Sequence, residues 1–170
     1  MTDEDHVVRA FADHDAFEAV ESGYRSTATP FEAVADAEAV EGEWRFRVVV
    51  TVPTIGAVVE GEEVGDVVAD GWYETFELRL EDAYDLVRAD RTDDPVVERD
   101  PDAGAVHATF GFGIDDLRQG VDDAAAVIDY VEGTYVQGVI PGYDYGDPVA
   151  GLLAEARRTG AADRGNDGPP

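Results

Sequence analysis

Negative charge is the feature that most limits how this chain can fold. Its 170 residues contain 39 Asp and Glu against 12 basic residues, and the formal net charge is −27. A chain with this much self-repulsion folds only if it can bury enough apolar surface. Val, Leu, Ile and Phe together supply 41 residues, about 24% of the chain, above the roughly 20% below which highly charged chains stay disordered. We therefore expect a folded domain.

The positive charges are all of one kind, since all 12 basic residues are Arg and the chain has neither Lys nor Cys. These absences exclude lysine Schiff bases, P-loop lysines, cysteine nucleophiles, disulfides and thiolate metal sites. Arg is weakly hydrated and pairs readily with carboxylates, and salt at about 1 M would screen the repulsion between the acids. This composition predicts a halophilic protein that works in concentrated salt.

The start of the chain shows no basic segment followed by an apolar one, and no apolar run is long enough to span a membrane. We therefore expect a cytoplasmic protein without a membrane partner.

The first third of the chain predicts one helix and a hairpin. Apolar residues at helical spacing predict a helix over residues 3–21. Residues 31–39 alternate between apolar and acidic, which indicates a half-buried strand, although residues 29–32 also fit a helical capping box. We adopt the strand. Residues 44–52 alternate in the same way, and Glu41-Gly42 between the two runs predicts a hairpin turn.

The middle of the chain predicts a helix and a second hairpin. Helical spacing extends from Val64 to Tyr84, with a short strand over residues 76–80 as the alternative. Residues 95–99 and 105–112 then predict two strands joined by a turn.

The last part predicts two helices and a tail. A helix is expected from Asp115 to about Tyr135, and a shorter one over residues 149–158. Residues 159–170 are rich in Gly, Asp and Pro and predict a disordered tail.

These elements predict a single α+β domain over residues 1–158, in the order α-β-β-α-β-β-α-α. The two hairpins would form a four-stranded antiparallel sheet with the helices packed on one face.

The acidic residues do not reveal a catalytic or metal site. Adjacent acidic pairs are no more frequent than chance predicts, so acid–base partners cannot be chosen by residue type. His6 and His14 lie eight positions apart, whereas a helical metal site favours a spacing of four. Nucleic-acid binding requires clustered positive charge, and the arginines are scattered. We predict no catalytic residue, no metal, no cofactor and no nucleic-acid partner, and leave open whether the protein is an enzyme.

Two groups of residues remain as candidate binding surfaces. Arg45, Arg47 and His107 would share the uncovered face of the sheet and could bind an anion, unless the arginines pair with acids on the neighbouring strand. The second group is Tyr135, Tyr143, Asp144 and Tyr145, in a segment rich in Gly and Pro. Such a segment either binds a ligand or buries its tyrosines against the sheet edge.

Three short stretches carry a resemblance to a known family. They are DGWYETF at residues 70–76, YVEGTYV at residues 130–136 and PGYDY at residues 141–145. Together they resemble an uncharacterised haloarchaeal domain-of-unknown-function family, over about residues 5–153. The resemblance implies a haloarchaeal source and brings no activity, cofactor or catalytic residue. The element order is also similar to the secretion-chaperone-like fold of small helper proteins, by fold analogy alone.

The functional expectation rests on what is missing. Without a recognisable nucleophile or cofactor motif, we expect a non-enzymatic protein-interaction or helper domain, with an unknown protein partner or a second copy bound at the uncovered sheet face or the tyrosine segment. The alternative is a small-molecule-binding domain or small hydrolase with its pocket near Tyr143, Asp144 and Tyr145, and with His107 as base.

Overall fold

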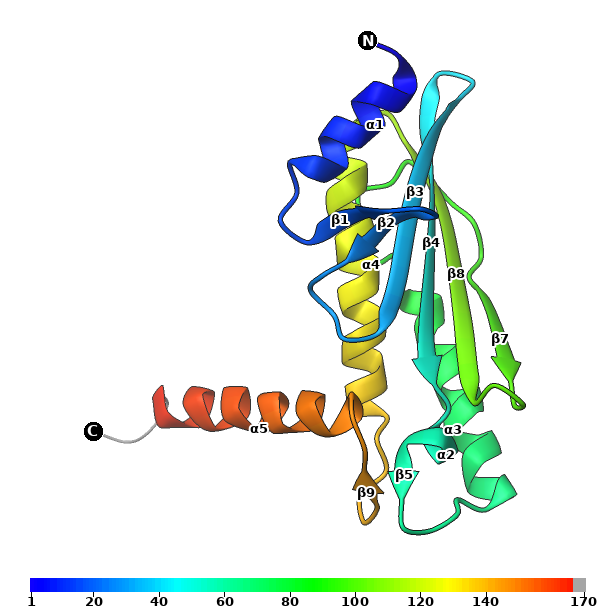
Figure 1. Ribbon diagram of the computed structural model, residues 1–170, viewed down its shortest axis with the longest axis vertical. Helices are drawn as coiled ribbons and strands as arrows, with labels where there is room; N and C mark the ends of the chain where they lie inside the picture. The colour runs from blue at the N-terminus through cyan, green and yellow to red at the C-terminus, as the bar shows by residue number, and fades with distance from the viewer. Residues whose placement is uncertain (167–170) are drawn as a thin grey trace.

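A computed structural model describes residues 1–166 of the chain, with side chains up to Thr159. A twisted antiparallel sheet forms its centre, and the helices, apart from the C-terminal one, lie on one side of that sheet (Figure 1). The elements are α1 (Asp3–Ala12), β1 (Phe17–Val20), β2 (Gly23–Ser26), β3 (Glu32–Val40), β4 (Glu43–Pro53), α2 (Ile55–Val58), β5 (Val59–Glu60), α3 (Asp66–Arg79), η1 (Leu80–Asp82), β6 (Arg91–Thr92), β7 (Val96–Asp100), β8 (Ala105–Ile114), α4 (Leu117–Gln137), β9 (Asp144–Tyr145) and α5 (Val149–Asn166).

Helix α1 is shorter than the sequence pattern predicts. It starts at a capping box between Thr2 and Asp5 but ends at Ala12, and residues 17–26 form the hairpin of β1 and β2 instead of more helix. The hairpin places Tyr24 in a parallel stack on Phe11, with 4.1 Å between ring centroids, and Phe17 edge-on to the same ring. Burial of these aromatic rings therefore overrides the helical spacing of residues 13–21.

The central hairpin forms where it was predicted. Strands β3 and β4 pair along their whole length around a turn at Glu41 and Gly42, both of which have positive φ, at 52° and 85°. A two-residue turn with positive φ at both positions has a backbone twist that matches the twist of the two strands it joins. The strand interpretation of residues 31–39 is confirmed.

The sheet is larger than predicted. It has seven strands in the order β1-β2-β3-β4-β8-β6, with β7 also paired to β8, and β5 and β9 form a separate two-stranded sheet. The prediction of four strands is wrong because β1, β2 and β6 add to the two expected hairpins. The class, α+β with a mostly antiparallel sheet, is confirmed.

Helix α3 ends five residues before the predicted limit at Tyr84. The chain passes through the 3-10 turn η1, and the Tyr84 hydroxyl then donates to the Gly111 carbonyl and accepts from the Gly111 N–H, both at 3.1 Å. A continuous helix could not bring Tyr84 to β8. Burial raises the pKa of Tyr84 to about 12, so the phenol keeps the proton that it donates.

Helix α4 covers the middle of the sheet, as Figure 1 shows, with α1 packed beside it and α3 against its C-terminal half. The sheet contributes alternate residues of β4 and β8 to the core: Phe46, Val48, Val50, Val52, Val106, Ala108, Phe110 and Phe112. Gly120 lets α4 approach closely, since a Cβ there would lie 2.2 Å from the Phe46 ring.

Helix α5 projects away from the sheet (Figure 1). Its buried residues Val149 and Leu152 attach its first turn to the core. The helix continues to Asn166, beyond the predicted end at residue 158. Of the predicted disordered tail, residues 167–170 lie outside the part of the chain that the structure describes.

Candidate functional site

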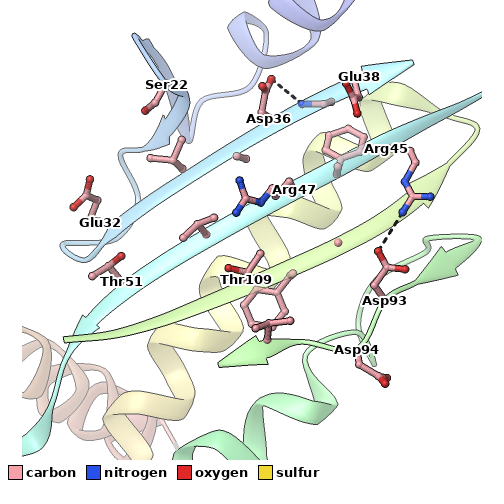
Figure 2. Close-up of a pocket in the computed structure, with 18 residues that line it drawn as sticks. Ser22, Glu32, Asp36, Glu38, Arg45, Arg47, Thr51, Asp93, Asp94 and Thr109 are labelled. Carbon is pink, nitrogen blue, oxygen red and sulfur yellow. Dashed lines mark hydrogen bonds and ion pairs between the residues drawn. The ribbon is translucent and has the colours of Figure 1, made fainter. Parts of the chain in front are cut away.

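The face of the sheet opposite the helices, called the open face below, is not covered by any element among residues 1–166. Its side chains alternate with the core residues along each strand. They surround a hollow of about 650 Å³, which Figure 2 shows from above. The hollow extends from β3 across β4 to β8 and the segment before β7. Its charged lining residues are Glu32, Asp36, Glu38, Arg45, Arg47, Asp93 and Asp94.

Arg47 lies in the middle of the hollow (Figure 2). Its register partners are Asp36 on β3 and Gly111 on β8, and its side chain is exposed. Within the described residues, no carboxylate oxygen lies within 4 Å of its guanidinium. Asp36 instead accepts a hydrogen bond from the Ala37 N–H at 2.8 Å. The Arg47 side chain therefore keeps its donors available to a ligand.

Arg45 differs from Arg47 because its charge is already matched. It donates to Asp93 at 3.1 Å and lies 3.9 Å from Glu43, which also pairs with Arg91. These four side chains form one ion-pair network at the β6 end of the open face.

Two glycines of β8 make room for this network. A Cβ on Gly111 would lie 2.8 Å from the Asp93 carboxylate, and a Cβ on Gly113 would lie 2.8 Å from that of Glu43. Both carboxylates thus lie against the β8 backbone at these glycines. A larger residue at either position would displace the carboxylate beside it. Asp93 carries no local signal in the sequence that marks it as a site residue, since its partner Arg45 is 48 positions away.

The hollow carries more negative than positive charge. Five carboxylates and two guanidinium groups line it. The pair of Arg45 and Asp93 neutralises one charge of each sign, which leaves four carboxylates against Arg47. Apolar side chains lie between the charged ones, at Val34, Val49 and Val96, and Val96 is 53% exposed. The lining thus combines acidic and apolar groups.

His107 lies on the same face but outside the hollow. Its Nδ1 is 3.0 Å from the Thr51 hydroxyl, and Glu98 of β7 is its register partner. Along β8 it lies four residues from Gly111, the register partner of Arg47, which is about 13 Å in an extended strand. The three predicted residues Arg45, Arg47 and His107 therefore share one face without forming a compact basic patch. The alternative, in which both arginines pair with acids of β3, is also not seen among the described residues. Arg45 pairs with Glu43 and Asp93 instead, and Arg47 forms no ion pair.

The tyrosine segment is mostly used for packing. Tyr135 is fully buried, with Phe31, Trp72 and Phe76 around its ring, and burial raises the pKa of its phenol. The Tyr145 hydroxyl donates to the Ile140 carbonyl at 2.6 Å and accepts from the Ile140 N–H at 3.1 Å.

The other two residues of that segment lie at the surface. Tyr143 is half-buried and Asp144 is exposed, opposite Glu60 in the short ladder of β5 and β9. The structure therefore does not bring these four residues together as one surface, and it places His107 on a different sheet from Asp144.

The described residues show neither a metal-binding cluster nor a membrane-spanning helix. Among them, no three His, Asp or Glu side chains are arranged to hold a metal ion. No helix in the same part of the chain has the length and apolar character required to cross a membrane.

Comparison with known proteins identifies one family. A family model described as a family of unknown function (DUF5813) matches residues 12–155. No curated protein and no solved structure matches the chain.

Proposed function

The chain belongs to the DUF5813 family of unknown function. We propose that it is a non-enzymatic interaction domain of the helper type. Its open face binds a segment of another protein that carries basic side chains alternating with apolar ones. The observation that carries this proposal is the uncovered hollow of about 650 Å³ with four unmatched carboxylates around the exposed Arg47.

The charges of the hollow favour a basic partner. Glu32, Asp36, Glu38 and Asp94 form no ion pair with any described Arg or His. Arg or Lys side chains of a partner would supply the missing positive charges. The negative electrostatic potential of the hollow would steer their approach. Arg47 can donate to backbone carbonyls of the bound segment. Val34 and Val49 offer contacts to the partner's apolar side chains.

Other occupants fit the hollow less well. A phosphate backbone would meet four unmatched carboxylates, which disfavours nucleic acid. A second copy of the chain would bring the same excess of negative charge to the interface, and like charges placed opposite each other oppose binding. The basic segment is the occupant with complementary charge.

Synthetic peptides test the proposal directly. A fluorescent peptide of alternating Arg and Val, and a matched peptide of alternating Glu and Val, are titrated with the protein at about 1 M KCl, where long-range attraction is screened. We expect saturable binding of the Arg peptide only. The double substitution Asp36→Asn and Glu38→Gln should weaken that binding about tenfold, equivalent to about 1.4 kcal/mol.

A control variant separates the hollow from general charge. Glu74→Gln with Glu81→Gln removes two exposed carboxylates on α3 and η1, away from the open face, and should leave the affinity unchanged. Equal weakening by both double variants, or absence of binding to the wild-type protein, would contradict the proposal. Light scattering of the free protein detects the other outcome, a homodimer.

A further inference from the structure

The outer edge of β3 is covered over only part of its length. Strand β2 pairs with it at two positions, Tyr24 with Ala35 and Arg25 with Val34. Over residues 36–40, no strand in the described part of the chain pairs with β3 on the side away from β4. In Figure 1 the hairpin of β1 and β2 crosses β3 before this segment. Residues 36–40 therefore form a free edge of the sheet.

The backbone groups of two alanines face this free edge. The two-residue turn between β3 and β4 closes on the pair of Val40 and Glu43. Such a pair exchanges two hydrogen bonds, and bonded and non-bonded pairs alternate from there along an antiparallel ladder. Ala39 and Ala37 occupy non-bonded positions, so their N–H and C=O groups point away from β4. In agreement, the Ala37 N–H donates to the Asp36 carboxylate at 2.8 Å, as Figure 2 shows.

A notch of about 520 Å³ lies beside the free edge. Residues 36–39 of β3 line it, together with the turn of the β1–β2 hairpin and the start of α1. Ala39 is exposed, and its register partner Trp44 is partly exposed on the same face. Because alanine side chains are short, the notch leaves room beside β3 for the side chains of another strand.

The charges around the free edge are all negative. No Arg or His lines the notch, and its acids form no ion pair with any described Arg or His. These acids are Asp3, Glu4, Glu21, Asp36 and Glu38. Opposite charges on directly opposed residues stabilise two paired strands, and like charges destabilise them. The edge therefore favours a strand with basic residues and disfavours the β3 edge of a second copy.

We propose that the basic segment binds as an added strand, antiparallel to β3 along residues 36–40. Its apolar residues lie opposite Ala37 and Ala39 and exchange backbone hydrogen bonds with them. Its basic residues lie opposite Asp36 and Glu38, which line both the notch and the hollow. This inference rests on the proposed function, because it assigns the binding mode of the same segment. In such a mode, backbone bonds supply affinity and alternate side chains supply specificity.

N-methylated forms of the alternating Arg and Val peptide test the binding mode. A methyl group on a backbone nitrogen removes one donor and keeps every side chain. In the antiparallel arrangement the valines donate to β3, and the N–H groups of the arginines point away from it. We expect methylation of the valines to weaken binding at least tenfold and methylation of the arginines to leave the affinity unchanged. Equal effects of the two sets, or a loss from the arginine set alone, would overturn the inference.

Two variants at position 39 test the edge from the side of the protein. Ala39→Pro removes the outward N–H and breaks no bond to β4, and edge strands tolerate Pro at such positions. Ala39→Val is the matched control, since it adds a side chain of similar size and keeps the N–H. Ala39→Pro should weaken binding of the unmethylated peptide about tenfold, and Ala39→Val should not. Circular dichroism checks the fold, and the methylated peptides decide the case if Ala39→Pro does not fold.

The outcomes separate this inference from the proposed function. Binding of the unmethylated peptide that is insensitive to both methylation sets and to Ala39→Pro would overturn the added strand, while the proposed function would stand. Absence of binding of that peptide to the wild-type protein would overturn both.

Discussion

Arg45 donates a 3.1 Å hydrogen bond to Asp93, and the accepting carboxylate lies on the backbone of Gly111. The two residues are 48 positions apart and meet because β8 has no side chain at this point. The pair removes Arg45 from the set of available cations and leaves Arg47 as the exposed positive charge of the hollow. The charge of the hollow thus depends on Gly111, because this glycine leaves room for the Asp93 carboxylate that pairs with Arg45.

The first prediction concerns Gly111→Ala. The new methyl group would lie 2.8 Å from the Asp93 carboxylate, so Asp93 must move and its bond to Arg45 is lost. An ion pair this exposed contributes about 0.2–1 kcal/mol, whereas replacing a strand Gly by Ala stabilises by about 0.5–1 kcal/mol, so we expect urea denaturation to show a net change of less than about 1 kcal/mol. A high-resolution structure of the variant in which Arg45 still bonds to Asp93 would contradict this explanation.

The second prediction compares two glycines of α4. Gly120→Ala would place a methyl group 2.2 Å from the Phe46 ring, whereas Gly133→Ala meets no atom within 4 Å. Overpacking at a helix–sheet contact costs about 1–3 kcal/mol, but replacing an exposed helical Gly by Ala stabilises by up to about 1 kcal/mol. We expect opposite shifts of the melting temperature, down for Gly120→Ala and up for Gly133→Ala. Shifts of the same sign would show that α4 does not approach the sheet this closely.

The third prediction concerns pH. Burial raises the pKa of Glu132, opposed in part by a hydrogen bond with Thr29. Because its folded-state pKa is raised, the stability that this group contributes is present at low pH and is lost as the pH rises through the raised value. Glu132→Gln should therefore stabilise the protein at neutral pH, by less than about 1 kcal/mol for a half-exposed group. The gain should shrink as the pH falls towards about 4.

Glu74→Gln serves as the control for this prediction, since it removes the same charge from an exposed site on α3. Thermal melts of both variants across that pH range separate the effect of burial from the effect of net charge. If the two variants gain equally at neutral pH, burial of Glu132 makes no contribution.

The fourth prediction concerns salt. At a net charge of −27, repulsion between carboxylates opposes folding and is screened within about 3 Å at 1 M salt but not at low salt. We expect the melting temperature to fall by several degrees or more on dialysis from about 1 M to about 0.05 M KCl. A melting temperature independent of salt would show that the acidic composition is not an adaptation to salt.

The sequence predicts the elements whose hydrophobic period is unambiguous. Alternation of apolar and polar residues identified β3, β4 and β8, the turn after residue 99 identified β7 as the partner of β8, and a helical stripe identified α4. The hairpin of β1 and β2 was missed because the spacing of Phe17 and Val20 fits a helix, whereas the extended conformation that these residues adopt leaves no period-two alternation in residues 17–20. Only the distant ring of Phe11 decides between helix and strand, through its stack with Tyr24.

The same limit applies to the candidate site. Alternation along β4 correctly placed Arg45 and Arg47 on the face away from the core. It could not show which of the two stays unpaired, because that depends on Asp93 lying across Gly111 of a third strand. Tyr135 likewise ended the predicted helical stripe and also belonged to the candidate tyrosine segment, and only the packing of α4 shows that it is buried.

The most direct test of the central claim, that the open face binds a basic protein segment, is site-specific crosslinking in the hollow. Because the chain has no Cys, Thr109→Cys on β8 gives one attachment point for a photoreactive group inside the hollow, and Glu74→Cys gives a control point on α3. Crosslinking in a native high-salt lysate, followed by mass spectrometry, identifies the peptide captured at each position. The account predicts a segment rich in Arg or Lys, captured from position 109 only and displaced by the alternating Arg and Val peptide. Capture of an acidic segment or of a second copy of this chain, or identical capture at both positions, would contradict it.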